Sequence, residues 1–202
     1  MSLDVLCIGH AAYDVLFYLE RFPSENSKSE TSFSLESGGG PAANAAYLLS
    51  KWGVRCGFGG VVGNDYYGRQ ILTEFKSVGT DTSLLETRSD LSTPLSFILV
   101  NRQTGSRTVV NRKAAYSPLR LQPAALAGIC PGVLLFDGHE LDAARAALSA
   151  FPNAASLLDA GSAREGTLAL ADKVTYLLAS ERFALQVTGL PNLASSDRRE
   201  AC

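Results

Sequence analysis

The chain has 202 residues, of which 46% are hydrophobic, and this length and composition fit one globular domain. Eighteen Lys and Arg residues stand against 20 Asp and Glu residues, so the formal net charge is −2 and a nucleic-acid-binding surface is not expected. The sequence has no apolar run of membrane-spanning length and no signal-peptide pattern at its start, so we expect neither a membrane partner nor secretion.

Short apolar runs alternate with amphipathic stretches along the chain, which predicts alternating strands and helices. The expected strands lie at 3–9, 15–22, 32–37, 54–62, 133–137, 155–159 and 174–179. The expected helices lie at 41–52, 66–78, 141–151, 165–171 and 181–188. This rhythm predicts an α/β fold with a parallel sheet and helices on both of its faces.

Two of the helices have clear start and stop signals. Pro41 suits the first helical position of one helix, and Gly53 follows its expected end. Asp65 is placed to cap the helix at 66–78, and Gly79 is placed to stop it.

A β-hairpin interrupts the strand–helix rhythm. Residues 95–101 and 107–111 read as strands around a five-residue loop, Arg102 to Ser106. Together with the strands at 15–22 and 32–37, the hairpin is expected to form a separate small sheet that acts as a lid.

The last residues of the sequence resemble the start of a helix that does not continue. Ser195 to Asp197 resemble a helix cap, and residues 198–202 resemble only the first turn of that helix. One turn has almost no stability of its own, so we expect the chain to be incomplete at its C-terminus.

Four cysteines, Cys7, Cys56, Cys130 and Cys202, lack the close pairs typical of zinc sites. Cys7 and Cys130 lie in or beside apolar segments, and we expect both thiols to be buried. This usage favours a reducing, cytoplasmic location.

A glycine-rich segment predicts a ligand site. Residues 37–46 read Ser-Gly-Gly-Gly-Pro-Ala-Ala-Asn-Ala-Ala, so three glycines lead into a helix. Glycines let free backbone N–H groups at a helix N-terminus approach a polar or anionic ligand, and Asn44 adds a donor and an acceptor. The segment lacks the Gly-Lys-Ser/Thr of a P-loop. A dinucleotide fingerprint at 57–63 fails because Val62 replaces its last glycine, which disfavours a nicotinamide-dependent oxidoreductase.

Four segments, in order and spacing, resemble the ribokinase-like (PfkB) family of carbohydrate and nucleoside kinases. They are Gly9-His10-Ala11-Ala12-Tyr13-Asp14 after the first strand, the segment from Gly38 to Asn44, the "G-x-x-G-x-D-x-x-G" stretch within 59–68, and the hairpin carrying Gly105-Ser106-Arg107-Thr108. The resemblance implies one ribokinase-like, doubly wound α/β domain over residues 1–202, incomplete at its C-terminus. It also implies a β lid from about 15–37 and 93–113.

The resemblance further implies transfer of the γ-phosphoryl group of ATP to a sugar hydroxyl, usually with Mg²⁺. The family's catalytic base lies in a "G-A-G-D" signature that this sequence lacks, so no catalytic residue is assigned and the chain alone is expected to be inactive. The family's "N-x-x-E" motif would fall at 180–183, which leaves Glu181 as the carboxylate on the ATP side.

The same resemblance makes Asp14 a clamp on two sugar hydroxyls and makes Gly39, Gly40 and Asn44 sugar contacts. Asp14 also follows a buried strand, where the side chains of an α/β protein reach the ligand crevice. The alternative for Asp14 is an ordinary turn aspartate. The alternative for Gly39, Gly40 and Asn44 is a tight turn with a helix cap.

Further candidates surround this set. Lys28 and Asn111, with Arg112 and Lys113, lie on or beside the lid strands and suit an anionic group on the sugar, although a solvated lid surface explains them equally well.

The end of the strand at 133–137 supplies another pair of candidates. His139 and Glu140 follow this strand and are candidates for substrate contact. His10 is expected to support a strand end, and Asp159 is expected to cap the following turn rather than to contact the ligand.

The leading hypothesis is an ATP-dependent sugar kinase. A nucleoside kinase of the same family and a non-catalytic, ligand-binding member remain alternatives. The expected partners are a small sugar and, through the lid sheet, a second copy of the chain, because exposed strand edges need covering.

Overall fold

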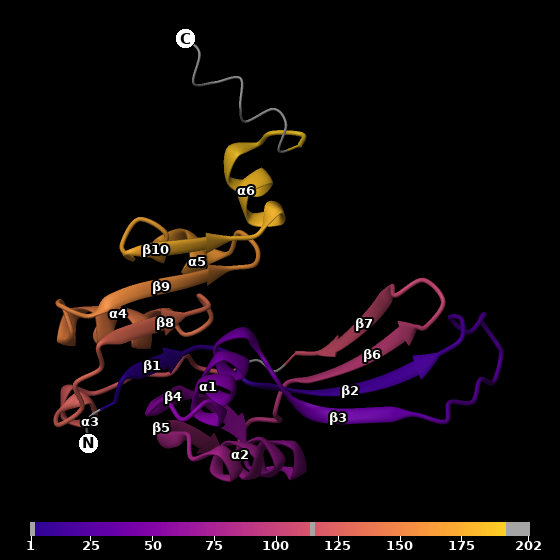
Figure 1. Cartoon of the computed structure of the whole chain (residues 1–202), viewed down its shortest axis with the longest axis horizontal. Helices are drawn as coiled ribbons and strands as arrows, with labels where there is room; N and C mark the ends of the chain where they lie inside the picture. Colours follow the sequence, from indigo (N-terminus) through magenta and orange to yellow (C-terminus); the bar gives the residue numbers. More distant parts are fainter. Residues whose placement is uncertain (1–2, 114–115, 193–202) are drawn as a thin grey trace.

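The computed structural model describes residues 3–113 and 116–192, which build a large sheet with its helices and a smaller sheet beside it (Figure 1). The strands of the large sheet are β1 (Val5–Ile8), β4 (Cys56–Gly63), β5 (Asp81–Arg88), β8 (Val133–Phe136), β9 (Ala155–Ala160) and β10 (Tyr176–Ala179). Their spatial order is β10-β9-β8-β1-β4-β5, and every neighbouring pair is parallel. The expected parallel α/β sheet is therefore confirmed.

Two hydrophobic cores lie on the two faces of this sheet. The helices are α1 (Pro41–Lys51), α2 (Tyr66–Val78), α3 (Pro123–Leu126), α4 (Leu141–Ala150), α5 (Glu165–Leu170) and α6 (Glu181–Thr188). Successive strand residues point to opposite faces, so Cys7 packs in the core with α1 and α2, while Leu6 and Ile8 pack in the core with α4 and α5. Helices on both faces confirm the doubly wound arrangement.

The smaller sheet contains the four strands β2 (Ala12–Leu19), β3 (Ser34–Gly39), β6 (Leu95–Asn101) and β7 (Arg107–Arg112) in the order β3-β2-β6-β7. The expected hairpin is confirmed as the antiparallel pair β6–β7. β2 is antiparallel to β3 and parallel to β6, so the sheet is mixed. In Figure 1 it extends away from one side of the large sheet.

Most expected elements occur within one to three residues of their predicted bounds, and α2 and α6 have the predicted bounds. Asp65 caps α2 and Gly79 ends it in the left-handed conformation, both as predicted. The sequence analysis missed β5 and the short α3. β5 lies at the edge of the sheet and buries only Leu84, so its sequence lacks the strong apolar signal of the central strands.

The structure also tests the predicted burial of two cysteines. Cys7 is buried as predicted, whereas Cys130 is exposed, so its expected burial was wrong: it lies in the loop after α3, outside both cores.

The helix expected from Ser195 onward falls outside the described residues. Within the described part of the chain, no helix combines the length and apolar character needed to cross a membrane.

Candidate functional site

The order of the strands identifies one edge of the large sheet as the place for a ligand. From β1 the chain proceeds to β4 and β5 on one side, and later to β8, β9 and β10 on the other. Ligands of open α/β sheets bind outside the carboxyl ends of the strands where this order reverses. Here that point lies between β1 and β8, which are followed by His10 and by Asp137 to His139.

Asp137 ties three segments together at this point. Its Oδ2 accepts hydrogen bonds from the backbone N–H of His10 at 2.9 Å and of Ala42 at 3.2 Å, and its Oδ1 accepts one from His139 at 3.0 Å. Burial raises the pKa of this carboxyl, while the three hydrogen bonds oppose that rise. Asp137 thus fixes the end of β1, the start of α1 and the end of β8 relative to one another.

Two imidazole rings stack at the same point. The ring centroids of His10 and His139 are 4.4 Å apart and their planes differ by 17°. Burial, together with the positive groups of His10, Arg164 and Lys113, lowers the pKa of His139 to about 3. Burial also lowers the pKa of His10, against the opposing charges of Asp137 and Asp14. His139 is therefore neutral at physiological pH.

The glycine segment passes very close to its neighbours. Gly40 has φ of +102°, a conformation that side chains disfavour, and a Cβ there would overlap the carbonyl oxygen of His10. A Cβ at Gly39 would overlap the carboxylate of Asp14. Only glycine fits at Gly40, whereas a side chain at Gly39 would require the Asp14 carboxylate to shift, so the expected turn brings Asp14, Gly39 and Gly40 together just before α1.

The register of the small sheet aligns four polar residues in one row. Asp14 of β2 lies between Ser37 of β3 and Ser96 of β6, and Ser96 lies opposite Asn111 of β7. Residues in one cross-strand row point to the same face of a sheet. Asp14 and Asn111 are thus on a common face with two hydroxyl side chains, at the inner end of the small sheet.

Asn44 lies at the first turn of α1 with its side chain exposed. It lines a pocket of about 450 Å³ between β3, α1 and α2, together with Gly39 and Glu74. Both carboxylate oxygens of Glu74 accept from the backbone N–H of Gly38, at 3.0 and 2.8 Å, and burial raises the pKa of this carboxyl. The structure therefore groups Asn44 with the glycine turn, as predicted from their spacing.

The remaining candidates are more dispersed. Lys28 is exposed in the connection between β2 and β3, at the end of the small sheet that points away from the large sheet in Figure 1. Glu181 is exposed in the first turn of α6, directly after the carboxyl end of β10. The structure does not bring Lys28 to the edge where β1 and β8 end, whereas Glu181 lies along that same edge.

Glu140 and Asp159 were also candidates, and the structure gives Glu140 a role in holding another segment of the chain. The Glu140 side chain is buried, and it accepts hydrogen bonds from Tyr116 Oη at 2.7 Å and from the backbone N–H of Leu119 at 2.6 Å. It holds the segment before α3 and has no free oxygen directed to a ligand. Asp159 is exposed near the end of β9, and its expected role as a cap of the following turn stays a prediction.

Sequence reasoning missed Asp137 and Arg164. The signal for Asp137 was present, since it directly follows the apolar run 133–136, and side chains at such strand ends lie near the ligand crevice of an open α/β sheet. Arg164 gave no signal, because its contact with His139 joins residues 25 positions apart. Nothing in the described segments groups three or more His, Cys, Asp or Glu side chains so that they could hold a metal ion.

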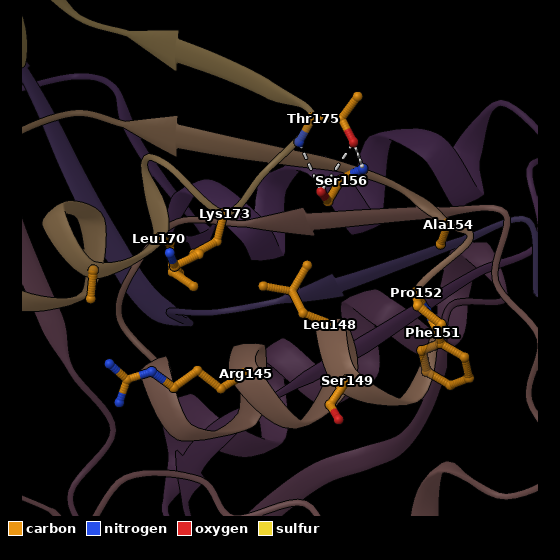
Figure 2. Close-up of a pocket in the computed structure, with 11 residues that line it drawn as sticks. Arg145, Leu148, Ser149, Phe151, Pro152, Ala154, Ser156, Leu170, Lys173 and Thr175 are labelled. Atoms are coloured by element: carbon orange, nitrogen blue, oxygen red, sulfur yellow. Dashed lines mark hydrogen bonds between the residues drawn. The ribbon is translucent and has the colours of Figure 1, made fainter.

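A second hollow lies at the opposite, amino edge of the sheet. Figure 2 shows side chains of α4, including Arg145 and Leu148, facing Lys173 and the hydrogen-bonded pair Ser156 and Thr175 near the starts of β9 and β10. Its volume is about 540 Å³. None of the predicted site residues lines it.

Comparison with known proteins identifies the family. The family model for pfkB carbohydrate kinases matches residues 2–202. The chain belongs to the pfkB family of carbohydrate kinases. Among curated relatives of this pfkB protein, ketohexokinase of Mus musculus is 29% identical over 107 residues, which are 53% of this chain and 36% of the relative. A nucleoside kinase of Methanothermobacter thermautotrophicus is 32% identical over 98 residues, 48% of this chain and 32% of the relative.

The fold of this pfkB chain also matches solved structures. The structure of Arabidopsis thaliana ribokinase complexed with ribose and ATP has a TM-score of 0.76 at 20% identity. The match covers 96% of this chain and 65% of the ribokinase. The chain thus corresponds to somewhat less than two thirds of that ribokinase, and the likeness confirms the ribokinase-like fold.

Proposed function

We propose that the intact protein is an ATP-dependent sugar kinase that transfers the γ-phosphoryl group of ATP to a sugar hydroxyl. The observation that carries the proposal is the polar row Ser37–Asp14–Ser96–Asn111, which lies beside the glycine turn at the reversal of strand order. A carboxylate in this position can accept hydrogen bonds from two hydroxyls, and the serines and the amide add further partners. Membership of the family supports the transfer chemistry.

Phosphoryl transfer depends mainly on positioning and on stabilisation of charge. In this proposal Asp14 orients the acceptor, and Gly39 and Gly40 let the backbone approach it. Asn44 and Asn111 add polar contacts from the helix and from the lid. The small sheet then excludes water when it closes over the acceptor, which is also the movement that Lys28 needs to reach it.

The proposed phosphoryl donor is ATP, which the structure of Arabidopsis ribokinase carries with ribose. Glu181 is the proposed carboxylate on the nucleotide side, because it follows the carboxyl end of β10. The described residues form no cluster of three or more His, Cys, Asp or Glu side chains that could hold Mg²⁺. The sequence lacks the G-A-G-D signature, and we expect the 202-residue chain to bind an acceptor without turnover.

Two alternatives retain specific support. The similarity to a nucleoside kinase favours a nucleoside as acceptor. The altered motif at 180–183 favours a non-catalytic binding protein, since Ser180 there serves as the N-cap of α6 and donates to the carbonyl of Gly161 at 2.9 Å.

We also propose a homodimer through the small sheet, in a cytoplasmic setting. Next to the polar row, on the same face, lies an apolar row of Leu35, Leu16, Ile98 and Val109. Leu35 and Val109 are 45% and 42% exposed. A second copy would cover these side chains and the open strand edges.

The test is calorimetric titration of the chain with a panel of sugars, polyols and nucleosides. We expect at least one compound to bind, and Asp14→Ala to weaken that binding roughly 10- to 100-fold, because charge-assisted hydrogen bonds are lost. Asp90→Ala, which removes an exposed carboxylate just before the lid hairpin, is the matched control and should change nothing. Absence of binding by the whole panel, or unchanged binding by Asp14→Ala, would contradict the proposal.

A further inference from the structure

Arg164 is held at the carboxyl edge of the large sheet by side chains rather than by a carboxylate. Its Nη1 contacts both ring nitrogens of His139, Nδ1 at 3.3 Å and Nε2 more closely. Its Nη2 donates to Ser162 Oγ at 3.0 Å. Across residues 3–113 and 116–192, none of the ion pairs involves Arg164.

His139 is suited to hold a cation in this way. Its ring is fixed by the stack on His10, and its backbone is fixed by Asp137. A neutral imidazole has one nitrogen that accepts a hydrogen bond, and Arg164 supplies the donor. The guanidinium is therefore positioned beside the point where β1 and β8 end, and it has N–H groups left over for another partner.

Charges of both signs lie near this guanidinium, since the Asp137 carboxylate accepts a hydrogen bond from the backbone of His139. The charge of Lys113, at the end of the lid hairpin, acts on His139 along with that of Arg164. Arginine presents a planar set of donors that matches the oxygens of a phosphate or carboxylate. Asp14, which suits hydroxyls, lies against Gly39, while the next residue, Gly40, lies against the backbone of His10, whose ring stacks on His139. Donors for an anion and an acceptor for hydroxyls thus lie along the same carboxyl edge of the large sheet.

We propose that Arg164, positioned by His139, forms an oxyanion-binding subsite at this edge of the sheet, which takes a phosphate group. The subsite rests on the proposed kinase function, in which two ligands could supply that group: a sugar that already carries a phosphate, or the terminal phosphate of ATP. Arg164 contacts the anion directly, whereas His139 acts through Arg164 as a positioning residue.

The experiment is an NMR titration of the chain with inorganic phosphate. We expect saturable shifts of the amides of His139 and of residues 162–164, and a roughly tenfold or greater loss of affinity in Arg164→Gln. Arg145→Gln, which removes an exposed arginine at the opposite edge of the sheet, is the matched control and should bind phosphate normally. Equal phosphate affinity in Arg164→Gln and in the unmodified chain would overturn the proposal.

Two further variants separate positioning from simple structural support. His139→Gln keeps a side-chain acceptor for Arg164 and should retain most of the phosphate affinity, whereas His139→Leu should lose it while remaining folded. If both variants bound phosphate like the unmodified chain, the positioning role of His139 would be refuted.

The source of the anion is tested with ribose, ribose 5-phosphate and a non-hydrolysable ATP analogue. An Arg164-dependent gain of ribose 5-phosphate over ribose assigns the subsite to the acceptor, and an Arg164-dependent affinity for the analogue assigns it to ATP. Sugar binding that is indifferent to phosphate and to Arg164→Gln contradicts the subsite but leaves the kinase proposal intact. Failure of every sugar and nucleoside to bind contradicts the kinase proposal instead.

Discussion

The two edges of the large sheet differ in how their polar groups are used. At the carboxyl edge, a buried carboxylate, Asp137, accepts three backbone hydrogen bonds, and two histidine rings stack with lowered pKa values. At the amino edge, the hollow in Figure 2 is lined by exposed charged side chains such as Arg145 and Lys173. Lys173 pairs with its neighbour Asp172 in solvent.

The difference between the edges shows that the volume of a hollow alone does not identify a ligand-binding site. The amino-edge hollow is larger, at about 540 Å³ against about 450 Å³ for the pocket beside the glycine turn. Burying a polar group costs free energy unless its hydrogen bonds are satisfied. Such a buried polar group, Asp137, lies at the carboxyl edge, beside the glycine turn and Asp14. Ligands of open α/β sheets generally bind at this edge, where the strand order reverses.

The largest effect is expected at Asp137. Asp137→Ala removes the acceptor of three backbone N–H groups and should lower the free energy of unfolding by about 3–5 kcal/mol. Urea denaturation measures this change. Asp142→Ala, which breaks an exposed 3.9 Å ion pair with Arg120, is the control and should cost under about 1 kcal/mol. Equal losses from the two variants would contradict the structural role of the buried Asp137 carboxylate.

A smaller loss is expected at Asp65, after the carboxyl end of β4. Its carboxylate accepts from Gly68 N at 2.9 Å, and from the backbone N and Oγ1 of Thr93 at 2.9 and 2.7 Å. Asp65→Ala should therefore cost about 1–2 kcal/mol of unfolding free energy, as loss of a helix cap does. Asp65→Asn keeps one acceptor and should cost less. If the alanine variant unfolds at the same urea concentration as the unmodified chain, this interpretation is wrong.

The lowered pKa of His139 predicts a pH dependence of stability. The ordinary pKa of 6.5 applies to the unfolded chain, and the folded value is about 3, so between these values the unfolded state binds more protons. The free energy of unfolding then rises with pH in this window. The contribution of His139 to it is fully present above about pH 6.5 and is lost as the pH falls toward 3. Urea denaturation at pH 7, 6 and 5 should show a weaker slope in His139→Asn. An identical slope in both proteins would contradict the burial of a neutral ring.

The smallest effect is expected at the amino edge. Arg145 has an exposed side chain and takes part in none of the ion pairs formed by the described residues. Arg145→Ala should change the free energy of unfolding by no more than about 0.5 kcal/mol and should leave sugar affinity unchanged. Calorimetric titration with the compound that binds the unmodified chain checks this. A clear loss of affinity would place a ligand at the amino edge.

Local signals in the sequence explain how much of the fold could be predicted. Asp65 and Gly79 define α2 by capping chemistry that acts within a few residues, and the apolar residues of β1 define a central strand. β5 escaped prediction because an edge strand with a single buried residue has no strong pattern. The burial of Cys130 was predicted wrongly because the apolar residues near it in sequence do not enclose it in the fold.

The candidate site was predictable only where a motif is continuous in sequence. The glycine turn with Asn44 was visible as one segment, and the family resemblance added Asp14. The polar row that joins Asp14 to Ser96 depends on strand register, which the sequence does not specify. The contact between Arg164 and His139 depends on the packing of two strand ends, which the sequence does not specify either.

The most direct test of the central claim is chemical-shift mapping of the chain's backbone amides during titration with the sugar panel. The account predicts that shifts concentrate at the carboxyl edge, in residues 38–44 and around His10 and His139. Shifts confined to the lining of the hollow in Figure 2, around Arg145, Leu148, Lys173 and Thr175, would contradict it.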